Sequence, residues 1–391
     1  MDFSYVKIGD IAEVTKLAGF EFTKYIEYTE DGDVIALRAL NLRNGELDLT
    51  DVKRIQSNVS NQLPRSKLYK NDLLLTYTGN GYGDCALIEE NDKYHLAPNI
   101  CKISPDESKI DPYYLYAVIR DRRFRELMKN YIGGSSQPTI PMKTIRILEI
   151  PVPELQTQKI IGGIVRNIDE KCRNNRKINE NLLQQVQSLY KDRFVDLHPF
   201  DGVMPADWHL GTVSEIIELH DSKRVPLSSR ERASLAKIYP YYGATSVMDY
   251  VDRYLFDGIY LLLGEDGTVV DSKGFPILQY VEGKFWVNNH AHIITGKNGF
   301  TVETLYLLFS LTNVQSIVTG AVQPKISQAN LNNVSVIIPS ELELSAFDSI
   351  VQPIFEQIRN LRAENDRLVA VRDTLLPRLM SGELDVSEFD I

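Results

Sequence analysis

The sequence predicts an α+β fold in which two similar α/β domains are separated by two long coiled-coil helices. Three observations lead to this prediction. The chain contains an internal repeat, each copy of the repeat ends in a heptad pattern, and strand-like runs alternate with glycine-rich turns ahead of that pattern. With 391 residues, 43% of them hydrophobic and 25% charged, the chain has a globular composition and is long enough for more than one core.

The internal repeat has a constant spacing of 186 residues. It is clearest around a Gln-Pro pair, where Gly134, Gln137, Pro138 and Ile140 return as Gly320, Gln323, Pro324 and Ile326. Upstream of this pair the two copies differ by small insertions. A fixed scaffold with divergent loops is typical of recognition modules that bind different targets, because loops vary without disturbing the core.

Both copies show the same order of elements ahead of the Gln-Pro pair. Strand-like apolar runs, interrupted by glycine-rich turns, lie at 33–40, 72–78, 254–263 and 276–281. A helix is then predicted in each copy after a capping residue, Asp111 in the first and Thr301 in the second. The copies therefore predict one fold used twice.

Each copy ends in a heptad pattern, from Ile161 to Leu189 and from Phe347 to Leu375. Apolar residues four and three positions apart share one helix face, which predicts two helices of about 35 to 40 residues and about 55 Å each. Asn179 and Asn365 occupy equivalent positions in these patterns. A polar residue in an apolar seam fixes register, so we expect both to set the helix pairing; exposure on the outer face is the alternative. Pro353 predicts a kink or a late start of the second helix.

These patterns divide the chain into four segments. We expect a first globular domain over 1–153, a first long helix over 154–196, a second globular domain over 197–341, and a second long helix with a C-terminal tail over 342–391.

Charge and cysteine content restrict the class of protein. The net charge of -10 argues against non-specific coating of DNA, which needs a strongly basic surface. Any DNA contact should therefore use local patches, with a basic partner sharing the phosphates. Three cysteines without a CxxC motif indicate free thiols in a reducing compartment. We expect a cytoplasmic protein with no metal site and no membrane segment, because no long apolar run is present.

Four segments carry a resemblance to a known family. They are Ile35 to Arg38 through Asn44 to Leu47, Asn71 to Gly79, Tyr239 to Thr245 with Tyr254 to Gly258, and Leu375 to Leu384. In this order, doubled around two heptad helices, they resemble the DNA specificity (S) subunit of type I restriction-modification systems. The resemblance implies two target-recognition domains in a pseudo-two-fold arrangement, with the two helices packed antiparallel between them.

The resemblance also implies a non-catalytic function. Each domain would read one half of an interrupted double-stranded DNA site, and the helices would set the spacer and dock methyltransferase (modification) subunits. Those subunits would use S-adenosylmethionine, and restriction/translocase subunits would use ATP and Mg2+, so this chain would bind no cofactor. Accordingly, the sequence has no Asn-Pro-Pro-aromatic methyltransferase motif and no P-loop.

Loop residues are the candidates for DNA contact, and we expect no catalytic residue. Glutamine can pair with adenine in the major groove, although the Gln-Pro turn could instead only close the domain onto its helix. His290 and His292 share a strand face and would suit a metal, but no third ligand has fitting spacing, so DNA contact near Asn289 is preferred. The candidates are Arg38, Tyr77, Asn80, Tyr82, Ser135, Ser136 and Gln137 in the first domain, and Tyr242, Thr245, Asn289, His290, Gln323 and Lys325 in the second.

Two other classes of function remain open from the sequence. A two-headed coiled-coil adaptor that binds proteins rather than DNA is compatible with the acidic balance. A nuclease or methyltransferase is disfavoured by the missing motifs.

Overall fold

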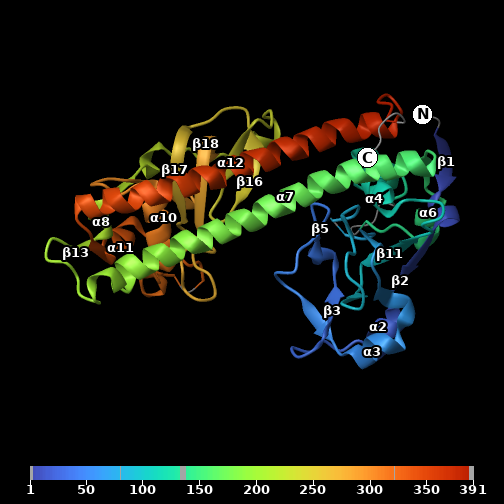
Figure 1. The fold of residues 1–391 in the computed structure, drawn as a ribbon, viewed down its shortest axis with the longest axis horizontal. Helices are drawn as coiled ribbons and strands as arrows, with labels where there is room; N and C mark the ends of the chain where they lie inside the picture. The colour runs from blue at the N-terminus through green and yellow to red at the C-terminus, as the bar shows by residue number, and fades with distance from the viewer. Residues whose placement is uncertain (1–2, 80, 133–137, 321, 387–391) are drawn as a thin grey trace. The chain divides into compact units, whose positions relative to one another are not determined.

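The computed structural model describes residues 3–79, 81–132, 138–320 and 322–386. The chain forms two compact units. Unit 1 comprises Met1–Asn174 with Glu364–Ile391, and unit 2 comprises Asn175–Ala363. The helices α7 (Leu155–Tyr190) and α12 (Glu341–Met380) each contribute one half to each unit (Figure 1).

Unit 1 contains two four-stranded sheets and two separate strand pairs. In one sheet the order is β2 (Ala12–Lys16), β11 (Ile100–Pro105), β8 (Leu73–Thr76), β9 (Cys85–Leu87). In the other it is β6 (Lys53–Ile55), β3 (Val34–Leu37), β10 (Tyr94–Leu96), β7 (Lys67–Leu68). The remaining strands pair as β1 (Ser4–Lys7) with β12 (Glu149–Val152), and β4 (Leu42–Arg43) with β5 (Glu46–Leu47). The helices are α1 (Ile8–Ile11), α2 (Gly19–Tyr25), α3 (Ser57–Gln62), α4 (Pro112–Arg120), α5 (Arg122–Lys129) and α6 (Met142–Ile147).

Unit 2 is built around one six-stranded sheet. Its order is β14 (Ile217–Leu219), β19 (Ala291–Gly296), β17 (Phe256–Gly264), β18 (Leu278–Val287), β15 (Tyr239–Tyr242), β16 (Val247–Val251). The strand β13 (His209–Thr212) pairs with β20 (Ser335–Ile338), as β1 pairs with β12 in unit 1. The helices are α8 (Val213–Ile216), α9 (Ser229–Ala233), α10 (Val302–Leu311) and α11 (Gln328–Asn332), and a π-helical turn, Lys191–Val195, extends α7.

Two opposed glycines bend the long strands of unit 2. Gly258 and Gly283 face each other across β17 and β18, and both have positive φ (135° and 83°), a conformation that favours glycine. Phe285 pairs with Phe256 at the start of β17, whereas Ala291, only six residues later, pairs with Gly264 at its end. The two strands must therefore curl, and the turn between β18 and β19 returns to the carboxyl end of β17.

The long helices pack antiparallel within each unit. In unit 1, Asn365 Nδ2 donates a hydrogen bond to the carbonyl of Cys172 (3.3 Å). In unit 2, Asn179 Nδ2 donates to the carbonyl of Ile358 (3.4 Å). Cys172 and Ile358 are themselves 186 residues apart, so the same bond is made once in each unit. The predicted α+β fold, with two related domains and two long antiparallel helices, is confirmed.

The expected late start of the second helix is wrong. The helix α12 begins at Glu341 and passes through Pro353 without interruption. Proline removes one backbone hydrogen bond, but its neighbours Val351 and Phe355 are buried in the core of unit 2. Their burial outweighs the lost bond. No helix in the described part of the chain combines the length and apolar character that crossing a bilayer requires.

A buried carboxylate fixes the helices to the globular part of unit 1, where α4 lies against α7 (Figure 1). Asp169 of α7 is 8% exposed and binds Arg120 of α4 at 2.6 Å and Arg372 of α12 at 2.9 Å. It therefore joins three helices, and its two cationic partners are themselves 12% exposed.

Asp169→Ala should lower the free energy of unfolding by about 3–5 kcal/mol, because it leaves two arginines buried without their counter-charge. Urea denaturation of the purified chain measures this change. The control is Arg166→Ala, which removes an exposed i,i+4 pair with Glu170 and should cost less than about 1 kcal/mol. Equal effects of the two substitutions would contradict the anchoring role of Asp169.

Candidate nucleic-acid interface

In each unit, the segment after the Gln-Pro pair binds the turn that follows a central strand. In unit 1, the N–H of Ile140 donates to the carbonyl of Tyr77, and the N–H of Gly79 donates to the carbonyl of Pro138, both at 2.9 Å. In unit 2, Ile326 donates to Glu265 and Gly267 to Pro324, again at 2.9 Å. We call each of these two assemblies a Gln-Pro junction.

The junctions share a backbone and differ in side chains. Gly79 and Gly267 have φ of 83° and 86°, which keeps the strand-end turn in the left-handed region. The facing pair is Thr78 with Thr139 in unit 1 and Asp266 with Lys325 in unit 2. The threonine hydroxyls are 2.7 Å apart, whereas the second pair is oppositely charged. The links use backbone atoms alone, so the side chains are free to differ.

Tyr77 and Tyr82 lie at the junction of unit 1. Both are half-buried against its core, and the Lys16 ammonium lies 5.2 Å from the centre of the Tyr77 ring. Arg38 lies after β3 in the other sheet, and its guanidinium binds Asp51 at 3.0 Å. Four candidates, Asn80, Ser135, Ser136 and Gln137, fall outside the described residues.

In unit 2 the structure brings together candidates that are far apart in sequence. Thr319 and Lys325 exchange two backbone hydrogen bonds (2.9 and 2.7 Å), so the exposed Gln323 lies in a closed hairpin loop. The Lys325 ammonium lies 3.2 Å from Glu265, and His290 binds the carboxylate of Asp266 through Nδ1. Gln323, Lys325 and His290 therefore surround a single strand end.

The remaining candidates of unit 2 lie around the neighbouring β15 turn. The backbone N–H of Asn288, next to the exposed Asn289, donates to the carbonyl of Tyr242 at 3.0 Å. The Tyr242 ring packs on Phe285 with centroids 5.8 Å apart, and Thr245 is exposed in the following turn. One loop, 288–290, thus contacts both the β15 turn and the junction.

Sequence reasoning missed a charge cluster beneath the junction of unit 2. His292 is fully buried, with Nδ1 2.6 Å from Asp221 Oδ2 and Nε2 2.8 Å from the carbonyl of Ile326. Both contacts are with acceptor oxygens, so each ring nitrogen is placed to donate a hydrogen bond. The Arg224 guanidinium lies 2.5 Å from Glu265 and 3.3 Å from Asp221. Arg224 and His292 therefore both face these two carboxylates.

The same residues have the donor types of a metal site. One ligand atom each of Asp221, Glu265 and His292 lies within 4.8 Å of the others. However, Arg224 already binds both carboxylates, and Nε2 of His292 donates to a carbonyl. The Arg224 guanidinium supplies positive charge where a metal ion would bring it, and both His292 nitrogens already have partners, so the geometry fits an ionic network better than a metal centre.

The network holds both carboxyl groups ionised. Burial alone would raise the pKa of Asp221, but the bonds from His292, Ile293 N–H and Gln328 outweigh burial and lower it. Burial would likewise raise the pKa of Glu265, and Arg224, His292 and Lys325 lower it instead.

Unit 1 has different chemistry at the same positions. Leu75 pairs with Cys101 as Leu263 pairs with His292, so Cys101 replaces His292 and Tyr77 replaces Glu265. Continuing the β14–β19 register by two residues places Asp221 opposite His292, where unit 1 has Lys16 opposite Cys101. A cation–π contact between Lys16 and Tyr77 thus stands where unit 2 has its ionic network.

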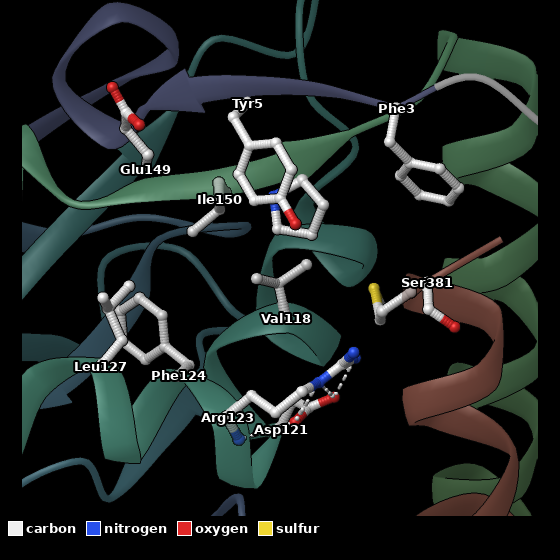
Figure 2. Close-up of a pocket in the computed structure, with 12 residues that line it drawn as sticks. Phe3, Tyr5, Val118, Asp121, Arg123, Phe124, Leu127, Glu149, Ile150 and Ser381 are labelled. Atoms are coloured by element: carbon white, nitrogen blue, oxygen red, sulfur yellow. Dashed lines mark hydrogen bonds and ion pairs between the residues drawn. The ribbon is translucent and has the colours of Figure 1, made fainter.

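Unit 1 also contains a pocket of about 340 Å³, formed by β1, β12, α4, α5 and the end of α12 (Figure 2). Figure 2 shows Phe3, Tyr5 and Phe124 around it, with Arg123 bound to Asp121. Of the candidate DNA-contacting residues that the structure describes, none lines it. In unit 2 the position of Phe3 is occupied by Trp208, whose ring packs against Phe194 and Phe200 (5.6 and 5.0 Å).

The duplicated domains, each ending in a paired helix and each carrying a Gln-Pro junction, define a protein built from two copies of one domain. The family model described as the type I restriction modification DNA specificity domain matches residues 1–184 and 205–364, and the chain belongs to this family. This agrees with the resemblance found in the sequence.

Named relatives and a solved structure agree with this assignment. The chain is 26% identical to the type I restriction enzyme MjaIX specificity subunit of Methanocaldococcus jannaschii, over 70% of this chain and 69% of that protein. It is 21% identical to the HindI specificity subunit of Haemophilus influenzae, over 98% of this chain and all of that protein. The crystal structure of a type I S subunit from M. genitalium shares the fold, with a TM-score of 0.57, 17% identity and coverage of 97% and 96% of the two chains. None of these names favours a protein-binding adaptor.

Lowered carboxyl pKa values in unit 2 predict a loss of stability in acid. A group whose pKa is lowered by folding stabilises the protein above its ordinary pKa and loses that contribution as pH falls through the folded value. The ordinary values are 3.8 for Asp221 and 4.5 for Glu265. Urea denaturation should therefore show Asp221→Asn destabilised near pH 7, with the difference from wild type shrinking as pH falls below about 4. The exposed Glu218→Gln is the control, and a difference that does not change with pH would contradict the ionic assignment.

Proposed function

We propose that this chain is the sequence-specific DNA-binding specificity subunit of a type I restriction-modification complex, in which each globular domain reads one half of a bipartite, interrupted site. The observation that supports this most strongly is the Gln-Pro junction. It is built twice with the same backbone links and different side chains, which suits two heads that read different sequences from one scaffold.

The exposed side chains at the junctions provide the chemistry for reading. The Gln323 amide can pair with adenine N6 and N7, and the Lys325 ammonium can bind guanine acceptors or a phosphate. In unit 2 the proposed surface also includes Asn289, His290, Thr245 and Tyr242. In unit 1 the proposed surface consists of Tyr77, Asn80, Tyr82, Ser135, Ser136 and Gln137. Arg38 would release Asp51 and bind a DNA phosphate in its place.

Catalysis and most phosphate binding belong to partner subunits in this proposal. The net charge of -10 leaves little general attraction for DNA, so basic modification subunits would share the backbone contacts. Those subunits would flip and methylate the target base with S-adenosylmethionine. Restriction subunits would use ATP and Mg2+, and this chain would hold no cofactor. The complex would act in the cytoplasm.

Exchange of one globular domain tests the assignment of half-sites. Replacing 197–341 by the corresponding segment of a relative, with the modification subunits co-expressed, should change one half of the methylated motif and leave the other intact. The reason is that each junction is closed by hydrogen bonds within its own unit. The measurement is sequencing of methylated adenines in the host genome. If both halves changed, the independence of the two domains would be refuted.

Lengthening both helices tests whether they set the spacer. Seven residues inserted after Asn179 and seven after Asn365 preserve the heptad and add about 10 Å to each helix. With about 3.4 Å per base pair, the methylated half-sites should then lie about three base pairs further apart. An insertion in one helix alone should disrupt the packing. An active double-insertion variant that methylates half-sites at the original spacing would show that the helices do not set the spacer length.

A further inference from the structure

Glu265 occupies the centre of the unit 2 junction. Its carbonyl accepts the N–H of Ile326, and its own N–H donates to the carbonyl of His290, both at 2.9 Å. Its carboxylate binds Arg224 at 2.5 Å and Lys325 at 3.2 Å. One residue thus contacts both loops that carry Gln323, Lys325 and His290.

The carboxylate of Glu265 is held from the core side. Its side chain is 12% exposed, and Arg224, which binds it, also donates to the carbonyl of Ala291 at 2.9 Å. The His292 ring lies 3.7 Å from it and is itself fixed by Asp221 and by the carbonyl of Ile326. With its core-side oxygen bound in this way, Glu265 presents the other oxygen toward Lys325.

The Lys325 side chain is 48% exposed, so its ammonium is both accessible and anchored. A free lysine is a flexible point charge, and binding to a fixed carboxylate restricts where that charge lies. Unit 1 has Thr139 at the position of Lys325 and Tyr77 at that of Glu265. Of the two junctions as the structure describes them, only that of unit 2 therefore has a lysine held by a fixed carboxylate.

We propose that Glu265, fixed by Arg224 and His292, is a positioning residue that sets the place of Lys325 for reading the half-site of unit 2. This rests on the proposed function and adds residues that touch no DNA themselves. A relaxed or misplaced lysine should weaken discrimination in that half-site and leave the half read by unit 1 unchanged.

The experiment uses the full chain in complex with its modification subunits. Glu265→Gln removes the anchoring charge with little change of size, and Lys325→Gln removes the anchored charge at an exposed position. Glu265→Asp keeps the carboxylate, and the exposed Glu218→Gln makes the same charge change elsewhere in unit 2. Exchange of 197–341 first shows which half-site unit 2 reads. Methylation is then measured on a library of oligonucleotides randomised in each half-site, which gives both the methylation rate and the base preference.

Glu265→Gln and Lys325→Gln should each lower methylation of the native site about tenfold, in line with loss of one base or phosphate contact. Both should broaden base preference only in the unit 2 half. Glu265→Asp should retain the wild-type preference, a rescue that a merely structural residue would not give, and Glu218→Gln should behave as wild type. If thermal melting shows that Glu265→Gln is unfolded, the methylation rate and base preference of Lys325→Gln serve as the test.

Wild-type rate and preference in a folded Glu265→Gln variant, or in Lys325→Gln, would overturn the inference, as would changes in the unit 1 half. A wild-type complex that methylates without any sequence preference would instead refute the proposed function itself.

Discussion

The structure depends on a backbone constraint, the closure of each Gln-Pro segment onto the turn after a central strand. The closure needs a carbonyl from proline and a left-handed glycine, Gly79 or Gly267, whose N–H meets it. Neither requirement involves a functional side chain. The segment can therefore fix where a loop begins without restricting what the loop displays, which is the property that a variable recognition surface requires.

Beneath this common closure the two units are supported by different chemistry. A buried ion pair gives little net stability, because the desolvation of both charges offsets their attraction. The Asp221, Glu265, Arg224 and His292 network is therefore better understood as fixing a conformation than as a source of stability. Lys16 and Tyr77 provide a weaker and less directional contact in unit 1. The junctions thus differ in the side-chain contacts beneath them as well as in the residues of their loops.

The sequence predicted the features that follow from local periodicity. The repeat and the heptads gave the two related domains and both long helices, and the asparagines of the two heptads make equivalent bonds in the structure. The ionic network could not be predicted, because Asp221 and His292 are 71 residues apart and meet only through strand pairing. The sequence also did not show that Tyr77 and Glu265 occupy equivalent positions in the two copies, because loop insertions shift this pair away from the constant spacing. The late helix start expected from Pro353 was wrong, because proline's helix-breaking effect is local, whereas the burial of its neighbours comes from tertiary packing.

The network also changes how the acidic composition should be interpreted. The net charge of -10 sums the charges of the whole chain without regard to where they lie, whereas Asp221 and Glu265 are matched locally by Arg224 and Lys325. In unit 1, Asp169 is likewise matched by Arg120 and Arg372. Carboxylates matched in this way contribute little field beyond the protein surface, because the opposite charges lie within a few ångströms of them. The potential at a junction is therefore set by the few exposed charges around it, and the sign of the total charge is a poor guide to whether such a surface can approach DNA.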